Sequence, residues 1–431
     1  MSNGSWDTVV IGSGCAGFSA ALALKKRGLN VAVLSANGGA SSVASGAWDF
    51  GPIPNQGSFV FDELRASRLW QNLYRKLLVD EKDSAPASEL KASALEVAEA
   101  LNPRLKIDFD FKRGYCLPTS SGLWKSTFGA QRLQVGADLK SLKGKRVGLV
   151  TSDHFRFRAD LIAKAWVEQA AKRGEILDIS PLWIHWNIPN GDWPLPHLAA
   201  RLEHDPLFRQ SFRSAIGERL EGSHYDLLIF PPLFLDPSFA DELSREFHCP
   251  VAECLATTEP IPGYRLTTAI AKTLQHLEIS NQVATQLQAE ASDGLARGLK
   301  YYSSSGSGWQ EVKAQSYVLA TGKLFGGGIK LGFDRIEESV FQLPLFTQRA
   351  QIEISRRSDL PWKQNNFRDE QAWAKLGVWL DGNYRPMDKS NQPVLRNLTA
   401  CGSLIGGLDF SRSGLGMGFM AYSGRQSGKQ I

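Results

Sequence analysis

The first 35 residues change twice in their pattern of apolar and polar positions. Residues 8–11 form a short apolar run rich in β-branched side chains, which is typical of a buried parallel strand. Residues 20–27 are good helix formers that end at Gly28, and residues 30–34 form a second apolar run. This order predicts one strand–helix–strand unit over residues 7–35.

Residues 56–262 alternate between helical and strand-like spacing of their apolar positions. The helical patterns lie at residues 59–79, 89–101, 159–172, 198–221 and 238–247. The strand-like patterns lie at residues 107–111, 146–150, 176–183, 225–230 and 251–255. Strands that alternate with helices predict a mixed α/β region in this part of the chain.

The last third of the chain returns to strand patterns before a final helix. Helical spacing over residues 266–277 is followed by strand-like runs at 283–291, 299–302, 309–314 and 317–320. These runs predict a β-meander. Residues 397–400 then form a short apolar run, and residues 419–427 have helical spacing. Seven glycines lie from Gly402 to Gly424, more than a surface loop requires, so this strand, loop and helix suit a phosphate or the edge of a flavin.

Gly12, Gly14 and Gly17 form the pattern G-x-G-x-x-G between the first predicted strand and its helix. The first glycine allows a tight turn, the second lets the backbone approach a pyrophosphate, and the third lets helix and strand pack closely. Because a helix N-terminus attracts anions, we expect these glycines and Ala16 to bind a nucleotide phosphate. The alternative is a glycine-rich turn in another kind of α/β protein.

The end of the second predicted strand departs from the usual dinucleotide pattern. An acidic residue normally stands there to bind the adenosine ribose, and this chain has Ser35. Either the dinucleotide is held differently, or the cofactor has no adenosine. Other small residues that follow predicted strands are expected to approach the cofactor. With Ser35, these residues are Ser45, Gly46, Asp49, Ala320, Thr321, Gly322, Gly402, Ser403, Gly416 and Gly418.

Composition narrows the class of protein. The chain of 431 residues is 43% hydrophobic and 22% charged, with a formal net charge of +5, which is typical of a globular protein and gives no reason to expect nucleic-acid binding. Its five cysteines are widely spaced, which argues against a disulfide framework, a zinc site and an iron–sulfur cluster. We expect no metal, no signal peptide and no transmembrane helix, and therefore a cytoplasmic protein.

Five stretches together resemble a known family. They are S-G-A-W-D at 45–49, P-I-P-G-Y-R-L at 260–266, V-L-A-T-G-K-L-F-G-G-G at 318–328, Y-R-P at 384–386 and N-L-T-A-C-G-S-L-I-G-G-L-D at 397–409. The chain resembles the B subunit of anaerobic glycerol-3-phosphate dehydrogenase, a member of the two-domain flavoproteins. The family has a run richer in glycine, with a cysteine, where this chain has Leu415 and Met417.

The resemblance implies a fold. It implies an α/β protein with a Rossmann-type flavin-binding domain assembled from both chain ends and an inserted mixed α/β second domain. The expected boundaries are 1–55 plus 263–330 plus 391–431 for the flavin-binding domain, 56–262 for the inserted region, and 331–390 for a substrate or cap segment.

The resemblance also implies a function. It implies a flavoprotein subunit that oxidises sn-glycerol 3-phosphate to dihydroxyacetone phosphate and passes electrons to quinone. The partners would be a second flavoprotein subunit and an iron–sulfur subunit, with the complex on the inner face of the cytoplasmic membrane. The family implies FMN, in agreement with Ser35, whereas the G-x-G-x-x-G motif favours FAD.

Candidate catalytic groups lie in or beside the matching stretches. Arg265, Arg385 and Arg412 could bind a substrate phosphate, or could be structural. Lys323 follows the A-T-G sequence and could contact flavin or a pyrophosphate, or be a solvated turn residue. His154 is a candidate base, and Asp409, like Asp49, could bind ribityl hydroxyls or only cap glycine turns.

Two alternative functions stay open. One is a stand-alone flavin-dependent dehydrogenase or reductase that acts on another small anionic substrate. The other is a non-catalytic subunit that relays electrons or holds a complex together. No obvious base stands out in the sequence, which favours this second alternative.

Overall fold

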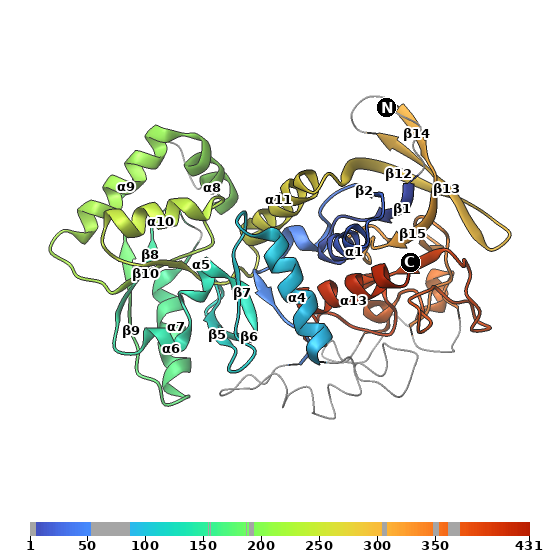
Figure 1. Cartoon of the computed structure of the whole chain (residues 1–431). Coiled ribbons are helices and arrows are strands. Elements are labelled where there is room, and N and C mark those ends of the chain that lie inside the picture. The colour runs from blue at the N-terminus through green and yellow to red at the C-terminus, as the bar shows by residue number, and fades with distance from the viewer. Residues whose placement is uncertain are drawn as a thin grey trace.

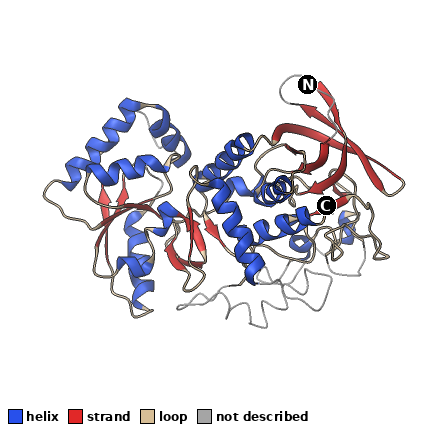
Figure 2. Cartoon of the chain, in the orientation of Figure 1, coloured by secondary structure: helices blue, strands red, loops and turns tan. Residues whose placement is uncertain are grey.

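The chain forms two lobes that lie side by side in a computed structural model (Figure 1). The structure describes residues 6–52, 87–153, 155, 157–186, 188, 194–303, 308–347, 353–360 and 371–431. The helix expected at residues 59–79 and the candidate base His154 lie outside these residues. Both labelled chain ends lie in the same lobe, at the right of the view. Each lobe combines helices with strands (Figure 2).

The right-hand lobe is built on a seven-stranded sheet whose strand order is β14-β13-β12-β2-β1-β15-β18. The five strands from β12 to β18 in this order are parallel, and β13 and β14 extend the sheet beyond β12 as antiparallel strands. The strands are β1 (Trp6–Ile11), β2 (Val31–Ser35), β12 (Ser280–Ser292), β13 (Leu295–Ser303), β14 (Gly308–Val312), β15 (Ala314–Leu319) and β18 (Leu398–Ala400). Strands from both ends of the chain therefore pair in one sheet, and this confirms the predicted fold class.

The predicted β-meander is correct only for its first three strands. β12, β13 and β14 do follow one another as antiparallel neighbours. β15 instead crosses over and pairs in parallel with β1, with Thr8 opposite Ser316. The apolar run at residues 317–319 is fully buried, as a central parallel strand requires, and apolar spacing alone does not reveal which neighbour a strand pairs with.

Four helices pack together in this lobe: three contact the sheet, and α4 packs on these three (Figure 1). They are α1 (Cys15–Lys26), α4 (Ala87–Leu101), α11 (Ile261–His276) and α13 (Met417–Lys429). The hydroxyl of Ser19 on α1 donates to the carbonyl of Ala421 on α13 at 2.6 Å. Arg425 on α13 pairs with Glu89 and Glu96 of α4. Helices from residues that are hundreds of positions apart in the sequence therefore form one layer.

The left-hand lobe has its own parallel sheet, in the order β11-β10-β8-β9. Its elements are β8 (Arg146–Thr151), α7 (Ala159–Ala171), β9 (Asp178–Trp183), α8 (Leu195–His204), α9 (Pro206–Leu220), β10 (Leu227–Phe230), α10 (Pro237–Glu246) and β11 (Val251–Glu253). If the strands are numbered 1 to 4 in chain order and read from β9 to β11, their order is 2-1-3-4. This is the start of a flavodoxin-like doubly wound sheet. The predicted α/β insertion is thus itself a doubly wound domain.

A buried ion pair joins the two lobes. Arg265 on α11 donates through Nη2 to Oε2 of Glu253 at the end of β11, at 2.7 Å, and both side chains are almost fully buried. Arg265 Nη1 also donates to the carbonyl of Phe234, while Glu253 Oε1 accepts from the amides of Leu233 and Phe234. The carboxyl edge of the inserted sheet, where doubly wound domains usually bind ligands, is here a docking contact.

The remaining elements are short. The strands are β3 (Ala47–Trp48), β4 (Ile107–Phe109), β5 (Tyr115–Pro118), β6 (Trp124–Thr127), β7 (Gly129–Gln131), β16 (Ile329–Leu331) and β17 (Ile336–Glu338). The helices are α5 (Arg132–Val135), α6 (Leu139–Leu142), α12 (Ala372–Lys375), and the 3₁₀ turns η1 (Gly39–Val43), η2 (Arg357–Asp359) and η3 (Gly402–Leu404).

The described residues contain two large hydrophobic cores and two much smaller clusters. One is built around β1, α1 and β15, and the other around β8, β10 and α9. α4 packs with the first core, although it lies early in the segment between the chain ends. We retain as a proposal the division into 1–55 plus 263–330 plus 391–431, 56–262, and 331–390.

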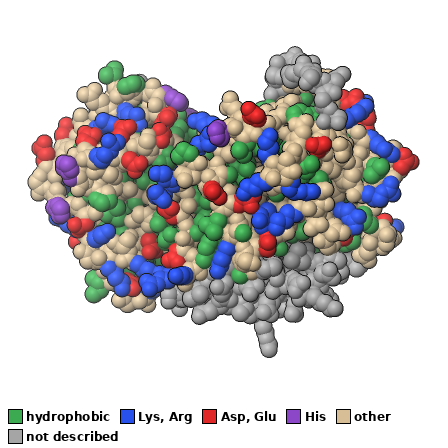
Figure 3. All heavy atoms as spheres, in the orientation of Figure 1, with side chains coloured by type: hydrophobic (Ala, Val, Ile, Leu, Met, Phe, Trp, Pro, Cys, Tyr) green, Lys and Arg blue, Asp and Glu red, His purple; other side chains and the backbone are tan. Residues whose placement is uncertain are grey.

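The surface mixes charges of both signs. On the face shown in Figure 3, lysine and arginine side chains are interspersed with aspartate and glutamate, without a large patch of one sign. Within the described ranges, no helix combines the length and apolar character needed to cross a bilayer.

Candidate functional site

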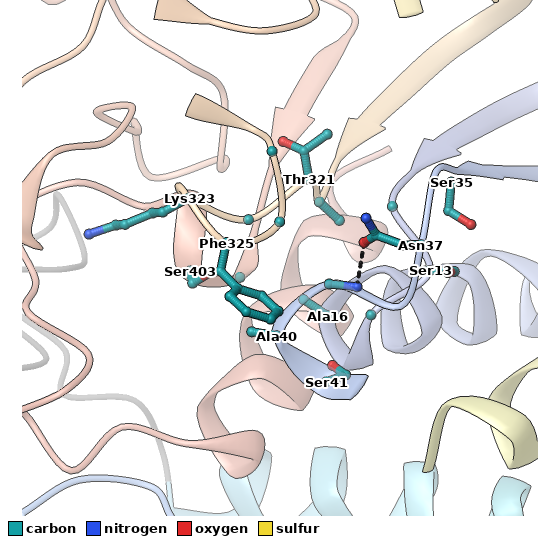
Figure 4. Close-up of a pocket in the computed structure, with 18 of the residues that line it drawn as sticks. Ser13, Ala16, Ser35, Asn37, Ala40, Ser41, Thr321, Lys323, Phe325 and Ser403 are labelled. Carbon is teal, nitrogen blue, oxygen red and sulfur yellow. Dashed lines mark hydrogen bonds between the residues drawn. The ribbon is translucent and has the colours of Figure 1, made fainter. Parts of the chain in front are cut away.

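A cavity of about 450 Å³ opens where β1, β2 and β15 end. Its size is within the usual range for small-molecule sites. Four loops form most of its wall (Figure 4). They are the glycine turn after β1, the segment after β2, the loop after β15, and the turn that leads into α13. A ligand at the carboxyl ends of parallel strands is expected for a doubly wound sheet.

The glycine turn places the backbone directly against the cavity. Gly12 has φ of +114°, and a Cβ atom there would lie 2.3 Å from the carbonyl oxygen of Ala320. Gly12, Gly14 and Ala16 line the cavity, whereas Gly17 packs inside against Gly12. The first turn of α1 holds no acidic side chain, so its partial positive charge is available to an anion. These features fit the pyrophosphate of a dinucleotide.

The second wall follows β2 and carries small polar groups. Ser35 ends β2 and lines the cavity, as expected from the sequence. Asn37 Oδ1 accepts a hydrogen bond from the amide of Gly39 at 2.8 Å (Figure 4). Ser41 Oγ accepts from the amide of Cys15 at 3.0 Å. These bonds fix the loop over the N-terminus of α1.

Gln286 of β12 faces the same end of the cavity. Its φ of +52° lies in the left-handed region, and the pairing of β12 with β13 shifts register between Thr285 and Gln288. Bulges of this kind often redirect side chains beside functional sites. Together with Ser35, the bulge shapes the part of the cavity beyond the glycine turn.

The third wall is the loop after β15. Ala320, Thr321, Gly322 and Lys323 all line the cavity, as expected. Lys323 Nζ donates to the carbonyls of Ala374 and Leu408, each at 2.7 Å. Burial lowers the pKa of Lys323 to about 7, and the nearby charge of Asp409 opposes this shift. Lys323 therefore anchors three separate segments and is not a solvated turn residue.

The fourth wall is the segment that leads into α13. Gly402, Ser403 and Gly416 line the cavity, as do Leu415 and Met417, the two residues that differ from the resembling family. The Ser423 hydroxyl accepts a hydrogen bond from the amide of Gly402 at 3.1 Å. The cavity thus extends from the end of β2 to the N-terminus of α13.

The charges around the cavity are few and positive. Among the described lining residues, the charged side chains are Lys323 and Lys330, and none is an aspartate, glutamate, histidine or arginine. Because Lys323 Nζ already donates to the carbonyls of Ala374 and Leu408, Lys330 and the N-terminus of α1 are the groups that suit an anionic cofactor. The described wall offers no carboxylate or imidazole that could act as a base.

Several expected cofactor-binding residues lie just outside the described cavity wall. The carbonyl of Ser45 accepts from Gln134 Nε2 at 2.9 Å, and Gly46 packs against the same side chain. The Asp49 carboxylate pairs with Lys125 at 2.7 Å, and its carbonyl accepts from the amides of Gly416 and Gly418. Gly418 packs on the ring of Phe50. Asp49 thus supports the turn into α13, and none of these four residues is among the described residues that line the cavity.

The candidate phosphate-binding arginines are also not among the described residues that line the cavity. Arg265 is buried in the ion pair with Glu253, and Arg385 pairs with Asp381 at 2.7 Å. Arg412 Nε lies 3.7 Å from Asp409 Oδ2. Asp409 Oδ1 accepts a hydrogen bond from the amide of Ser411. In each case a neighbouring carboxylate engages the guanidinium. The structure does not bring these arginines together.

Sequence reasoning missed several residues that line the cavity. They include Ser13, Asn37, Gln286, Phe325, Lys330, Phe410 and Met420. Asn37 stands next to the loop of residues 38–46, whose small side chains did indicate a close approach. Gln286 carried no signal, because a β-bulge is not visible in apolar spacing. Phe325 stood inside a matching stretch and could have been found there.

The cysteines are not suited to redox chemistry. Cys15 lines the cavity, and burial followed by the proximity of Cys401 raises the pKa of its thiol to about 12. Burial likewise raises the pKa of Cys401 to about 12. Both thiols stay protonated at neutral pH. Over the described part of the chain, no cluster of three or more histidine, cysteine, aspartate or glutamate side chains could hold a metal ion.

Comparison with known sequences gives matches along the chain. Residues 7–180 match the family model described as FAD dependent oxidoreductase, and residues 282–418 match the one described as FAD binding domain. The chain is 24% identical over 441 residues to the B subunit of anaerobic glycerol-3-phosphate dehydrogenase from Glaesserella parasuis, with 96% of each chain covered. It is 25% identical over 431 residues to the same subunit of Yersinia pseudotuberculosis, with 96% of this chain and 95% of the relative covered.

Solved structures of low similarity match most of the chain. One is an open conformation of a flavocytochrome c3 fumarate reductase, at 12% identity and a TM-score of 0.44, with 99% of this chain and 78% of that chain covered. Another is a 3-ketosteroid Δ1-dehydrogenase from Sterolibacterium denitrificans, at 11% identity and a TM-score of 0.41, with 99% of each chain covered.

The fold and the two family models define the class: the protein is an FAD-dependent oxidoreductase with a Rossmann-type flavin-binding domain. Within this class it is a distant homologue, over its full length and at 21–25% identity, of the B subunit of anaerobic glycerol-3-phosphate dehydrogenase. The family resemblance predicted from the sequence is thereby confirmed.

Proposed function

We propose that the cavity holds FAD and not FMN. The observation that carries this proposal is the lining of the cavity, which includes Ser35, Ala284 and Gln286 in addition to the glycine turn. An adenosine group would occupy this end, beyond the pyrophosphate at the N-terminus of α1. The hydroxyl of Ser35 and the amide of Gln286 would take the place of the usual acidic residue.

We further propose that the chain is one of the flavoprotein subunits of a quinone-linked glycerol-3-phosphate dehydrogenase. Support comes from the full-length relationship to proteins named as the B subunit of that enzyme. Bound flavin would supply the two-electron oxidation of an alcohol to a ketone. The residues of this chain would orient the cofactor, exclude water and keep the buried wall around Lys323 fixed.

The partners and the location follow from the same proposal. The substrate would be sn-glycerol 3-phosphate, with dihydroxyacetone phosphate as the product. A second flavoprotein subunit and an iron–sulfur subunit at the inner face of the cytoplasmic membrane would complete the complex. Electrons would leave this chain for the iron–sulfur subunit.

A second candidate is an electron-relay subunit without its own dehydrogenase activity. One observation favours it: no described residue that lines the cavity is an acid or a histidine. Oxidation of an alcohol needs a group that accepts the hydroxyl proton. In this version the substrate is oxidised on a partner subunit, and the flavin of this chain only passes electrons onward.

Two measurements test these proposals. Mass spectrometry of the cofactor released from the purified chain separates FAD from FMN, and we expect FAD. Reduction of the bound flavin by glycerol 3-phosphate, followed by its absorbance, separates the dehydrogenase from the relay. Reduction in the isolated chain would support the first function. Reduction only after a partner flavoprotein is added would support the second, and a chain that binds no flavin would contradict both.

A further inference from the structure

Phe325 is an exposed aromatic side chain on the wall of the cavity. It is 64% exposed and lines the cavity together with Ala40 and Ser403. Figure 4 shows its ring beside these two residues, with the alanine methyl groups of Ala16 and Ala40 close by and Ser35 on the far side of the glycine turn. The small neighbours leave the face of the ring accessible from the cavity.

The loop that carries Phe325 is held on both sides. The amide of Gly327 donates to the carbonyl of Leu324 at 3.2 Å, and the amide of Gly328 donates to the carbonyl of Lys323 at 3.0 Å. Lys323 in turn is anchored through Nζ to two carbonyls of other segments. The backbone therefore presents Phe325 at the cavity in a defined position.

An exposed phenyl ring in a fixed position favours a contact partner. Removing a phenylalanine side chain from water is favourable, so the exposed ring leaves this free energy available to a ligand. Aromatic rings prefer stacked or edge-to-face contacts with other rings. A flavin offers two flat ring systems, the isoalloxazine and the adenine.

We propose that Phe325 is a stacking platform for the isoalloxazine ring, an inference that rests on the proposed binding of FAD. The choice between the two rings follows from position. Ser35 and Gln286 mark the adenosine end, whereas Phe325 lies with Ser403 toward the N-terminus of α13. Phe325 thus contributes to the affinity for any flavin and not to the affinity for adenosine diphosphate.

The experiment measures the dissociation constants of three ligands for the flavin-free full chain. FMN contains the isoalloxazine ring without adenosine, ADP contains adenosine without the isoalloxazine ring, and FAD contains both. Isothermal titration with FMN and with ADP therefore reports on opposite ends of the cavity, and titration with FAD reports on both. In Phe325→Ala we expect FAD and FMN to bind about tenfold more weakly or worse, the size of one lost aromatic stacking contact, with ADP unchanged. Phe325→Tyr should keep wild-type affinity. Quenching of flavin fluorescence on binding should be weaker in Phe325→Ala.

Phe333→Ala is the matched control. Phe333 is 97% exposed but is not among the described residues that line the cavity. Its replacement should leave all three dissociation constants unchanged. Near-ultraviolet circular dichroism of each flavin-free variant checks that the fold is kept.

The outcomes separate the inference from the function on which it rests. If wild type binds flavin and Phe325→Ala binds it with the same affinity, the inference alone is overturned, and the exposed ring would instead be a contact for a protein partner. Equal weakening of ADP and FAD overturns the assignment to the isoalloxazine ring. Wild-type chain that binds neither FAD nor FMN overturns the proposed function, and the stacking role with it.

Discussion

Lys323 shows how one side chain can organise a site. Its ammonium group lies between the loop after β15, the helix α12 and the segment before Asp409, and it donates to a carbonyl of each of the latter two. Lys323 Nζ also lies 5.1 Å from the centre of the Phe410 ring. A cation in such a place costs desolvation energy, which hydrogen bonds to carbonyls offset in part.

The lowered pKa of Lys323 predicts a pH dependence of stability. Between pH 7 and pH 10.5 the unfolded chain binds more protons at this residue than the folded chain, so the free energy of unfolding rises with pH in this window. Lys323→Met should lack this rise. Urea unfolding from pH 6 to pH 9.5 measures the free energy of unfolding of both proteins, and the difference between wild type and variant should increase with pH. Lys330→Met is the control, and a constant gap would refute the prediction.

Gly12 is a position in the glycine turn where a side chain would be both strained and obstructed. Gly12→Ala would put a Cβ atom 2.3 Å from the carbonyl of Ala320 at φ of +114°. We expect most bound flavin to be lost, measured by its absorbance per protein, and a stability loss of about 1–3 kcal/mol or more. Gly28→Ala also has positive φ, +80°, but no atom within 4 Å of the added Cβ. It should cost only about 1 kcal/mol and keep full flavin occupancy. Equal behaviour of the two variants would contradict this account.

At the scale of elements, the crossing of α1 and α13 depends on Gly424. A Cβ atom there would lie 2.0 Å from the carbonyl oxygen of Ala16. Gly424→Ala should therefore push the helices apart and destabilise the chain by about 1–3 kcal/mol in denaturant unfolding. Gly217→Ala in α9 is the control, since its nearest neighbour, the Phe247 ring, is at 3.5 Å. That variant should gain up to about 1 kcal/mol from helix propensity, and a loss of equal size in both would argue against close helix packing.

The Arg265–Glu253 pair is the main polar contact between α11 and the inserted sheet. Arg265→Ala would leave a buried carboxylate without its cation and should cost about 3–5 kcal/mol. Adding Glu253→Gln should recover part of this loss, as a double-mutant cycle in urea would measure. Flavin content at low denaturant should be unchanged, because Arg265 does not line the described cavity. If Arg265→Ala kept wild-type stability but its bound flavin were no longer reduced by glycerol 3-phosphate, Arg265 would instead bind the substrate phosphate.

Local sequence predicted the elements better than it predicted their partners. The strand–helix–strand unit at residues 7–35 is correct within a few residues, because apolar spacing and glycines act locally. The roles of Arg265 and Arg385 could not be read in this way. Their chemistry is set by Glu253 and Asp381, and no spacing rule indicates that these carboxylates fold against them. The same holds for Asp49, which finds its cation on β6.

At the scale of the whole molecule, the two cores predict that flavin protects one lobe. Ligand that binds only the native state stabilises the elements it touches, by about 2.7 kcal/mol at a hundredfold excess over its dissociation constant. Hydrogen exchange should therefore slow in β1, β2, α1 and β15 when FAD is added. The strands β8, β9 and β10 should change little. Equal protection of both lobes would contradict a cofactor site confined to the first core.

The architecture was predictable where glycine motifs and chain order sufficed. A G-x-G-x-x-G turn near the start of the sequence and a glycine-rich turn near its end both point to one nucleotide-binding domain. The doubly wound order of the inserted sheet was not predictable, since strand order depends on crossovers that leave no local pattern. The position of β15 beside β1 was missed for the same reason.

The pairing of β1 with β15 also sets an order of events during synthesis. Thr8 and Ser316 hydrogen-bond across a separation of 308 residues. At ribosomal rates of about 5–20 residues per second, β1 waits roughly 15–60 s for its partner strand. The sheet of β8 to β11 has emerged by then and can already fold. Because Gly416 and Met417 complete the cavity wall, the whole cavity can form only after α13 has been translated.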